Sequence, residues 1–157
     1  MVIIEDSRQK PDKNAYIRAQ LETLGYTVVR NKLYVGDYTW TTDQRICVDT
    51  KADLQEVCGN VTQQHERFRA ECERAREAGI QLIILVQDPS IKTLDGVCGW
   101  FNWRRKKNPK ATSGKTLYGI MCKMTERYGV KWEFTTRENC GKRIVELLGG
   151  EEHSLEL

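Results

Sequence analysis

The strongest constraint on the fold of this chain is the apolar run at residues 80–86, "IQLIILV", which follows Gly79 and ends before Asp88 and Pro89. A short run rich in β-branched residues is typical of a strand that is buried on both faces. The segment before it, residues 62–78, carries Glu and Arg at helical spacing and only a thin apolar stripe. A strand reached through a helical crossover is predicted to be parallel and central, which indicates an α/β fold.

The rest of the pattern predicts further strands and helices around this unit. We expect strands at residues 2–5, 27–29, 33–35, 38–40, 46–51 and 130–134, the last at a sheet edge, and helices at residues 13–24, 54–58, 115–128 and 137–148. Asp12 is predicted to cap the first helix, with Leu24 on its buried face, and residues 30–32 to form a hairpin turn. We expect one domain at residues 1–150, in which helices flank a mixed sheet. We also expect a flexible C-terminal tail at residues 151–157.

Composition narrows the class of protein. The longest apolar run is far shorter than a bilayer requires, so no membrane partner is expected and the chain reads as a soluble, unexported protein. The 6 cysteines are spread along the chain without a C-x-x-C pair, which favours free thiols over a zinc site or a disulfide framework.

A basic run lies between the central strand and the next predicted helix. Its cations are Arg104, Arg105, Lys106, Lys107 and Lys110. Trp100, Phe101 and Trp103 come just before or within it, and bases can stack on aromatic rings while cations meet phosphates, so the run is a candidate DNA-binding surface. A solvated loop is the alternative, with Trp100 and Phe101 anchoring it to the core.

The segment at residues 46–51, "ICVDTK", begins as a buried strand and ends on charged residues. Asp49 and Lys51 project to one face of such a strand, whereas Thr50 points away. Asp37, which lies 12 positions upstream of Asp49, reaches that face if the strands pair as a meander. Two carboxylates and a backbone carbonyl suit Mg²⁺, and an adjacent lysine suits phosphodiester hydrolysis. A structural ion pair between Asp49 and Lys51 is the alternative.

Short motifs carry a resemblance to a known family. They are Asp6-Ser7-Arg8, Gly36-Asp37-Tyr38, and Val48-Asp49-Thr50-Lys51 followed by Asp53-Leu54. The chain resembles the XPF-type nuclease domain of the PD-(D/E)xK superfamily, in particular its small stand-alone members from bacteria and phages. The resemblance implies a single-domain restriction-endonuclease-like fold and a cytoplasmic, bacterial or phage-encoded endonuclease that acts in DNA repair or recombination on branched or junction-containing DNA.

The resemblance also implies roles for individual residues. Asp37 and Asp49 would be ligands of Mg²⁺ or Mn²⁺, Lys51 the catalytic lysine, and Asp6 an additional catalytic acid. Arg8 would contact a carboxylate or a DNA phosphate, although Asp6 and Arg8 could instead form a local ion pair at a strand end.

The chain departs from the family pattern at several positions. Asp49 replaces the family glutamate, Thr50 replaces an arginine, and Asp53 follows Lys51 by 2 residues where the family usually has four. These changes keep open a catalytically inactive DNA-binding or partner subunit, and a plain α/β domain with structural charges is the blandest alternative. A homodimer is a further expectation. An exposed apolar face on the last helix would suit its interface, formed by Ile144, Leu147 and Leu148.

Overall fold

A computed structural model describes residues 1–150, and the predicted tail at 151–157 lies outside the described residues. The strands are β1 (Val2–Asp6), β2 (Thr27–Asn31), β3 (Tyr38–Trp40), β4 (Ile46–Lys51), β5 (Gln81–Gln87) and β6 (Lys131–Thr135). The α-helices are α1 (Ala15–Thr23), α2 (Leu54–Val61), α3 (His65–Glu77), α4 (Gly114–Tyr128) and α5 (Cys140–Leu147), and two 3₁₀ helices are η1 (Leu94–Gly99) and η2 (Trp103–Lys106).

The strands form one mixed sheet in the order β2-β1-β3-β4-β5-β6. Only β3 runs against its neighbours, because it pairs antiparallel with both β1 and β4 while the remaining pairs are parallel. The predicted parallel strand in the interior of the sheet is β5, which lies between β4 and β6, and β6 is an edge strand as expected. The mixed α/β fold is confirmed.

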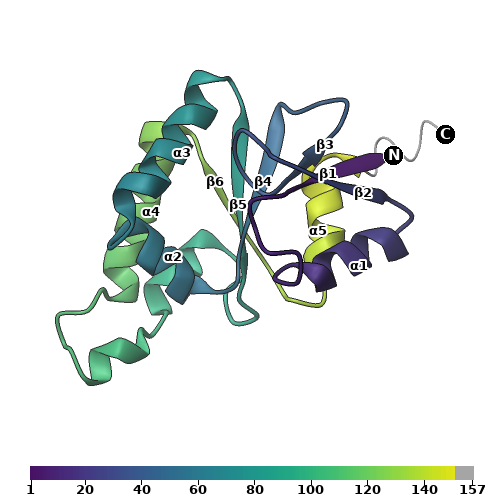
Figure 1. Ribbon diagram of the computed structural model, residues 1–157. Helices are drawn as coiled ribbons and strands as arrows, with labels where there is room; N and C mark the ends of the chain where they lie inside the picture. Colours follow the sequence, from purple (N-terminus) through teal and green to yellow (C-terminus); the bar gives the residue numbers. More distant parts are fainter. Residues whose placement is uncertain (151–157) are drawn as a thin grey trace.

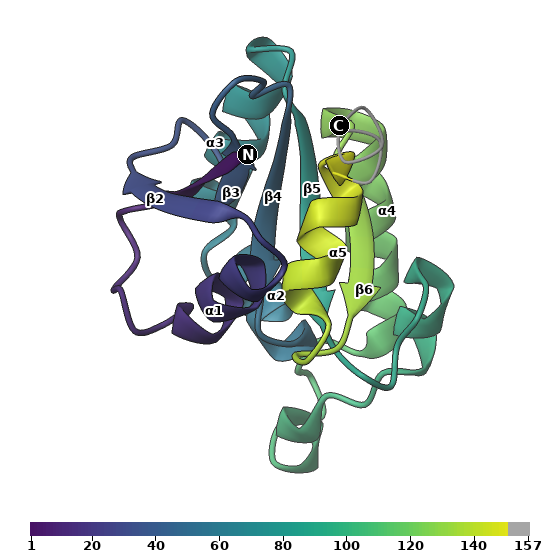
Figure 2. The same ribbon diagram turned by 90° about the vertical axis from the view of Figure 1, so that its right-hand side faces the viewer.

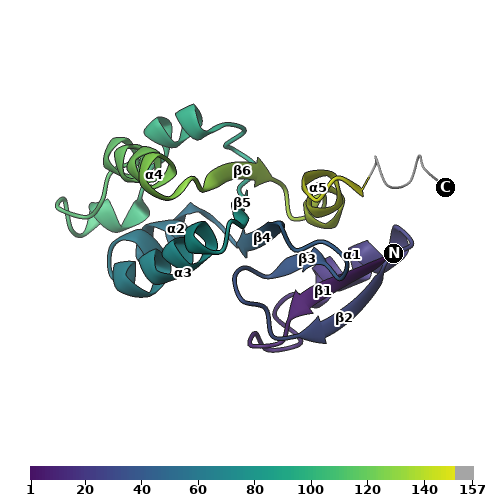
Figure 3. The same ribbon diagram turned by 90° about the horizontal axis from the view of Figure 1, so that it is seen from above.

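Helices cover both faces of the sheet in three layers (Figure 1). One face packs against α2, α3 and α4, and the other against α1 and α5, as the views in Figures 2 and 3 also show. The thin apolar stripe predicted for α3 is correct, since Phe68, Cys72 and Ala75 are all buried in the first of these cores. No helix within residues 1–150 is long and apolar enough to cross a membrane.

The predicted hairpin at residues 27–35 is wrong. Strand β2 continues to Asn31 and pairs in parallel with β1, so the chain does not turn back at residues 30–32. Leu33 and Val35 lie in an irregular loop, yet they are 4% and 1% exposed. Their apolar character therefore serves core packing from a loop.

Details at the helix ends also differ from the prediction. Asn14 occupies the N-cap of α1 in place of Asp12, and Leu24 is 47% exposed. The apolar residues of α5 are not exposed, because Ile144 and Leu148 are buried and Leu147 packs against the same core. The predicted dimer face on α5 is thus part of the interior.

Candidate active site

A tight turn before β3 places the first candidate acid. Gly36 has φ +74°, and a Cβ on it would lie 3.2 Å from the Cβ of Cys47 and 3.3 Å from the carbonyl oxygen of Val48. Glycine is therefore required both for the backbone conformation and for the close approach to β4. Asp37 follows, and its N–H donates to the Val48 carbonyl at 2.9 Å. The turn is fixed against β4.

The Asp37 side chain is buried at the β3–β4 junction, with 4% of its surface exposed. Its Oδ2 accepts hydrogen bonds from the backbone N–H and from the hydroxyl of Thr50, both at 2.9 Å. As predicted, Thr50 projects from the face of β4 opposite to Asp49 and Lys51, and from that face its hydroxyl is a direct partner of Asp37. The residue that replaces the family arginine thus orients a candidate metal ligand.

Asp49 and Lys51 lie at the end of β4, where the face that carries Cys47 meets α3. The Lys51 ammonium is 3.1 Å from Asp49 Oδ2, which is an ion-pair distance, but this buried oxygen accepts no hydrogen bond of good geometry. The predicted ion pair is therefore present, and it leaves one acceptor on Asp49 unsatisfied. The ammonium also lies 5.3 Å from the centre of the Phe68 ring.

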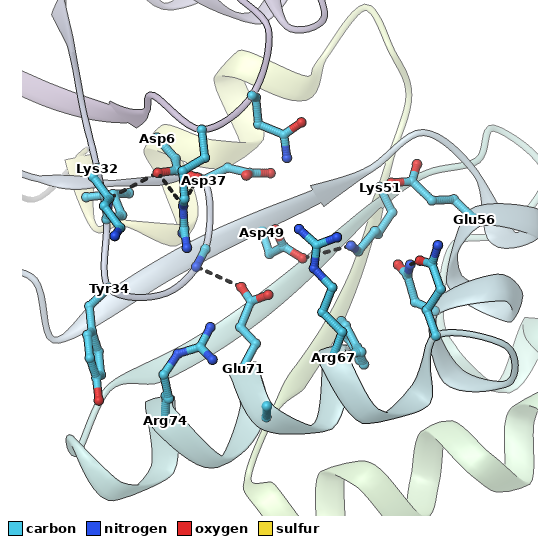
Figure 4. Close-up of a pocket in the computed structure, with 18 of the residues that line it drawn as sticks. Asp6, Lys32, Tyr34, Asp37, Asp49, Lys51, Glu56, Arg67, Glu71 and Arg74 are labelled. Atoms are coloured by element: carbon cyan, nitrogen blue, oxygen red, sulfur yellow. Dashed lines mark hydrogen bonds and ion pairs between the residues drawn. The ribbon is translucent and has the colours of Figure 1, made fainter.

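Glu71 on α3 is a third acid at this position, and it was not among the predicted site residues. Its Oε1 accepts a hydrogen bond from the Gly36 N–H at 2.9 Å, so α3 is tied directly to the turn that carries Asp37 (Figure 4). Glu71 lies three residues after Phe68 and four before Ala75, both of which face inward. This helical spacing was the available signal. We refer to Asp37, Asp49 and Glu71 as the acidic cluster.

The acids of the cluster perturb one another. Burial, and then the neighbouring Asp49 carboxylate, raise the pKa of Asp37 well above its ordinary value. Burial and Asp49 likewise raise the pKa of Glu71. Desolvation would lower the pKa of Lys51, but the surrounding carboxylates, led by Asp49, raise it overall. Within residues 1–150 the three acids of the cluster have fewer paired cations than carboxylates. Perturbed carboxylates such as Asp37 and Glu71 are a common mark of a functional site.

Asp6 and Arg8 are also brought to this site, where they pair with each other. Arg8 Nε is 2.9 Å from Asp6 Oδ2, and Asp6 Oδ1 accepts the Leu33 N–H at 3.0 Å. The Asp6 N–H in turn donates to the Asp37 carbonyl at 2.7 Å. The local ion pair between Asp6 and Arg8 is therefore observed, while a catalytic role for Asp6 stays a prediction.

These residues line one cleft of about 760 Å³. Its walls carry several further cations, namely Lys13, Lys32, Arg67 and Arg74. Arg67 and Arg74 come from α3 on either side of Glu71 and point into the cleft (Figure 4). Neither of them forms an ion pair within residues 1–150. The cleft thus combines an acidic floor with cationic walls, which suits a phosphodiester chain that approaches buried acids.

Two other predicted features lie outside this cleft. Asp53 caps α2, because its carboxylate accepts the Glu56 N–H at 2.8 Å, so its spacing from Lys51 reflects a helix cap. The basic run forms η2 and the loop after it and lies on the other side of α2. Within it, Trp100 packs against the core, but Phe101 is 59% exposed, so the expected structural anchor is only half correct.

The acids of the cleft offer oxygen ligands for a divalent cation. Within residues 1–150, no three His, Cys, Asp or Glu side chains are grouped so as to hold an ion by themselves. Asp37 and Asp49 are, however, adjacent and buried, and apart from the ion-pair contact with Lys51, Asp49 Oδ2 accepts no hydrogen bond of good geometry within residues 1–150. Mg²⁺ keeps several waters and often takes only one or two carboxylates together with substrate phosphates. A pair of acids with an unsatisfied oxygen fits that requirement.

Comparison with known proteins identifies the family. The ERCC4 domain matches residues 5–147. The chain belongs to the ERCC4 domain family. This confirms an XPF-type nuclease domain and supports a structure-specific DNA nuclease, and ERCC4 nucleases depend on divalent metals in general. No match was found among curated proteins.

Solved structures with the same fold include XPF from Aeropyrum pernix. That structure aligns with a TM-score of 0.68 at 19% identity over 99% of this chain and 67% of the other. The same protein in complex with DNA aligns with a TM-score of 0.67, again at 19% identity, over 98% of this chain and 66% of the other. The chain therefore spans about two thirds of the length of those chains and shares their fold.

Proposed function

We propose that this ERCC4 domain is an endonuclease that uses Mg²⁺ or Mn²⁺ to hydrolyse a phosphodiester bond of DNA at a branch or junction. The observation that carries the proposal is the buried pair Asp37 and Asp49 beside the Lys51 ammonium, at the floor of a cleft with cationic walls. The XPF complex with DNA supports DNA as the class of substrate.

In this proposal Asp37 and Asp49 hold the cation. When bound, the cation acidifies an attacking water and neutralises charge on the reacting phosphate. Thr50 keeps Asp37 oriented through two hydrogen bonds, and Gly36 with Glu71 fixes the turn behind it. The protein thereby supplies a rigid pair of acids.

The cations around the acids would act on the DNA. Lys51, held by Asp49, lies where it can stabilise negative charge that develops on the phosphate. Arg67 and Arg74 point into the cleft and would bind the phosphates next to the cleaved bond (Figure 4). Arg8 is paired with Asp6 but is 44% exposed, so it can meet a phosphate at the cleft rim.

The proposal is tested by cleavage of end-labelled splayed-arm, flap, four-way and linear duplex DNA with Mg²⁺ or Mn²⁺. Asp37→Asn and Lys51→Ala should abolish cleavage, whereas Glu22→Ala should cut like the wild type, because Glu22 is an exposed acid outside the cleft. If the protein binds junctions but does not cleave them, the nuclease proposal is refuted and a DNA-binding subunit is the better interpretation. If it neither binds nor cleaves DNA, only the plain α/β domain with structural charges is left. Gel filtration over a range of concentrations tests the homodimer, which stays a prediction.

A further inference from the structure

A second groove, of about 440 Å³, lies between α2 and the loop that carries the basic run. We call residues 102–112 the basic loop. It projects from the lower left of Figure 1, between β5 and α4. Helix α2 supplies Gln55 and Gly59 to the groove, and the basic loop supplies Trp103, Arg104 and Lys107. Among residues 1–150, no acidic residue lines it, in contrast to the active-site cleft.

Helix α2 separates this groove from the active-site cleft. Glu56 and Asn60 of α2 line the cleft, whereas Gln55 and Gly59, one position earlier in each case, line the groove. Each residue of an α-helix is rotated by about 100° from the previous one, so a single helix forms a wall of both spaces. The two spaces are therefore separated by roughly the 10 Å diameter of one helix.

The chemistry of the groove suits unpaired nucleotides. The Trp103 side chain is 59% exposed, and the Arg104 guanidinium lies 5.7 Å from the centre of its ring. Arg104, Lys107 and Lys110 form no ion pair within the described residues. An exposed aromatic ring offers a stacking surface that paired bases cannot use, while free cations bind the phosphate backbone.

The groove is also preorganised. Asn102 is 2% exposed, and its side chain donates to the Thr112 carbonyl at 2.9 Å while it accepts the Arg104 N–H at 3.1 Å. This closes the base of the basic loop, so Trp103 and Arg104 are presented from a fixed frame. On the opposite wall, Gln55 Oε1 is buried without a hydrogen-bond partner in residues 1–150.

We propose that this groove holds a single-stranded arm of the DNA while the cleft holds the strand to be cut, with α2 between them at the branch point. The inference rests on the proposed function in taking DNA as the ligand. It gives the preference for branched substrates a structural origin within the domain itself, since a continuous duplex cannot place unpaired bases on Trp103.

The test measures DNA binding in EDTA, so that it does not depend on cleavage. The probes are a fork with 2-aminopurine in its single-stranded arm and a blunt duplex of equal length. Trp103→Ala should weaken fork binding by about 5- to 150-fold, as expected for loss of one stacked base, and remove the quenching of 2-aminopurine. Duplex affinity should change less than about twofold. Lys107→Ala should reduce the salt slope for the fork by about 0.7, the value for one single-strand phosphate contact.

Matched controls decide the outcome. Phe101→Ala removes an aromatic ring that is also 59% exposed but does not line the groove, and Lys131→Ala removes an exposed lysine on β6. The inference is overturned if Phe101→Ala weakens fork binding as much as Trp103→Ala, or if both probes lose affinity equally. If the Trp103→Ala protein binds forks as tightly as the wild type and still cleaves them, the proposed role of the groove is refuted and the nuclease proposal is kept. If fork binding depends on Trp103 but the protein cleaves no DNA under any condition, the nuclease proposal is refuted and the proposed role of the groove is kept.

Discussion

The buried pair Asp37 and Asp49 leads to a prediction about stability that needs no substrate. The two residues are 4% and 5% exposed, and burial together with Asp49 raises the pKa of Asp37 well above its usual value. Like unit charges about 4 Å apart repel by roughly 4 kcal/mol at an effective dielectric constant of 20. Lys51, 3.1 Å from Asp49, offsets part of this cost. We expect Asp37→Asn to stabilise the metal-free protein by about 1–3 kcal/mol at neutral pH.

Asparagine is the appropriate substitution because its side-chain oxygen can still accept both hydrogen bonds from Thr50. The assay is urea unfolding at neutral pH, once in EDTA and once with excess Mn²⁺. A cation that binds only the folded protein stabilises it by about 2.7 kcal/mol at 100 times its Kd. The wild type should show this gain. The Asp37→Asn protein should show little of it, so the order of stability of the two proteins should reverse between EDTA and Mn²⁺.

Asp6→Asn is the matched control, because Asp6 is a buried acid of the same cleft that already has a partner. This change should destabilise the protein in EDTA by about 0.5–1 kcal/mol, a small loss since the paired Arg8 side chain is 44% exposed. Repulsion between the two acids is refuted if Asp37→Asn lowers the stability in EDTA, and cation binding by Asp37 is refuted if Mn²⁺ stabilises the Asp37→Asn protein as strongly as the wild type.

Three further outcomes are expected. Lys51→Met should destabilise the metal-free protein by about 3–5 kcal/mol, because it leaves a buried carboxylate without its partner, and added Mn²⁺ should recover part of the loss in the same urea assay. Burial raises the pKa of Cys72 to about 12, so iodoacetamide at mildly alkaline pH should modify the exposed Cys98 well before Cys72, as measured by peptide mass spectrometry. Tyr38→Phe should cost about 1.5–3 kcal/mol of unfolding free energy by removing the hydroxyl that donates to buried Glu5 at 2.8 Å, and an unchanged urea midpoint would contradict this.

The sequence predicts the parts of the site that depend on local pattern. Strand alternation places Asp49 and Lys51 on one face, and the Gly36 turn is visible from its composition. Glu71 could not be predicted in the same way. It lies beside the buried stripe of α3, where a charged residue is normally solvated, and only the crossing of α3 over the Gly36 turn makes it part of the site. Such a contact between residues 35 positions apart follows from tertiary packing.

Loops that bury apolar side chains were the main source of error in the strand prediction. Leu33 and Val35 alternate with other residues as in a strand, and both are buried, but the backbone between β2 and β3 bends past Asp6 instead of pairing. A hydrophobic pattern reports burial, and it reports strand pairing only when the backbone partners are near. The opposite error affected α5, whose apolar face was expected to be exposed and instead packs on the sheet.

Buried acids on the two faces of the sheet differ in how fully their charges are paired. Glu5 is 2% exposed and is fully compensated, with Arg18 at 2.8 Å, Arg30 at 3.0 Å and the Tyr38 hydroxyl at 2.8 Å. On the cleft side, the acidic cluster has a single ion pair within residues 1–150, to Lys51, although Arg67 and Arg74 are close by. A fold under selection for stability alone would pair these acids as it pairs Glu5, because an unpaired buried charge costs several kcal/mol. Within residues 1–150 the acidic cluster thus has one paired cation for three acids, which is the reason to test this position for a divalent cation.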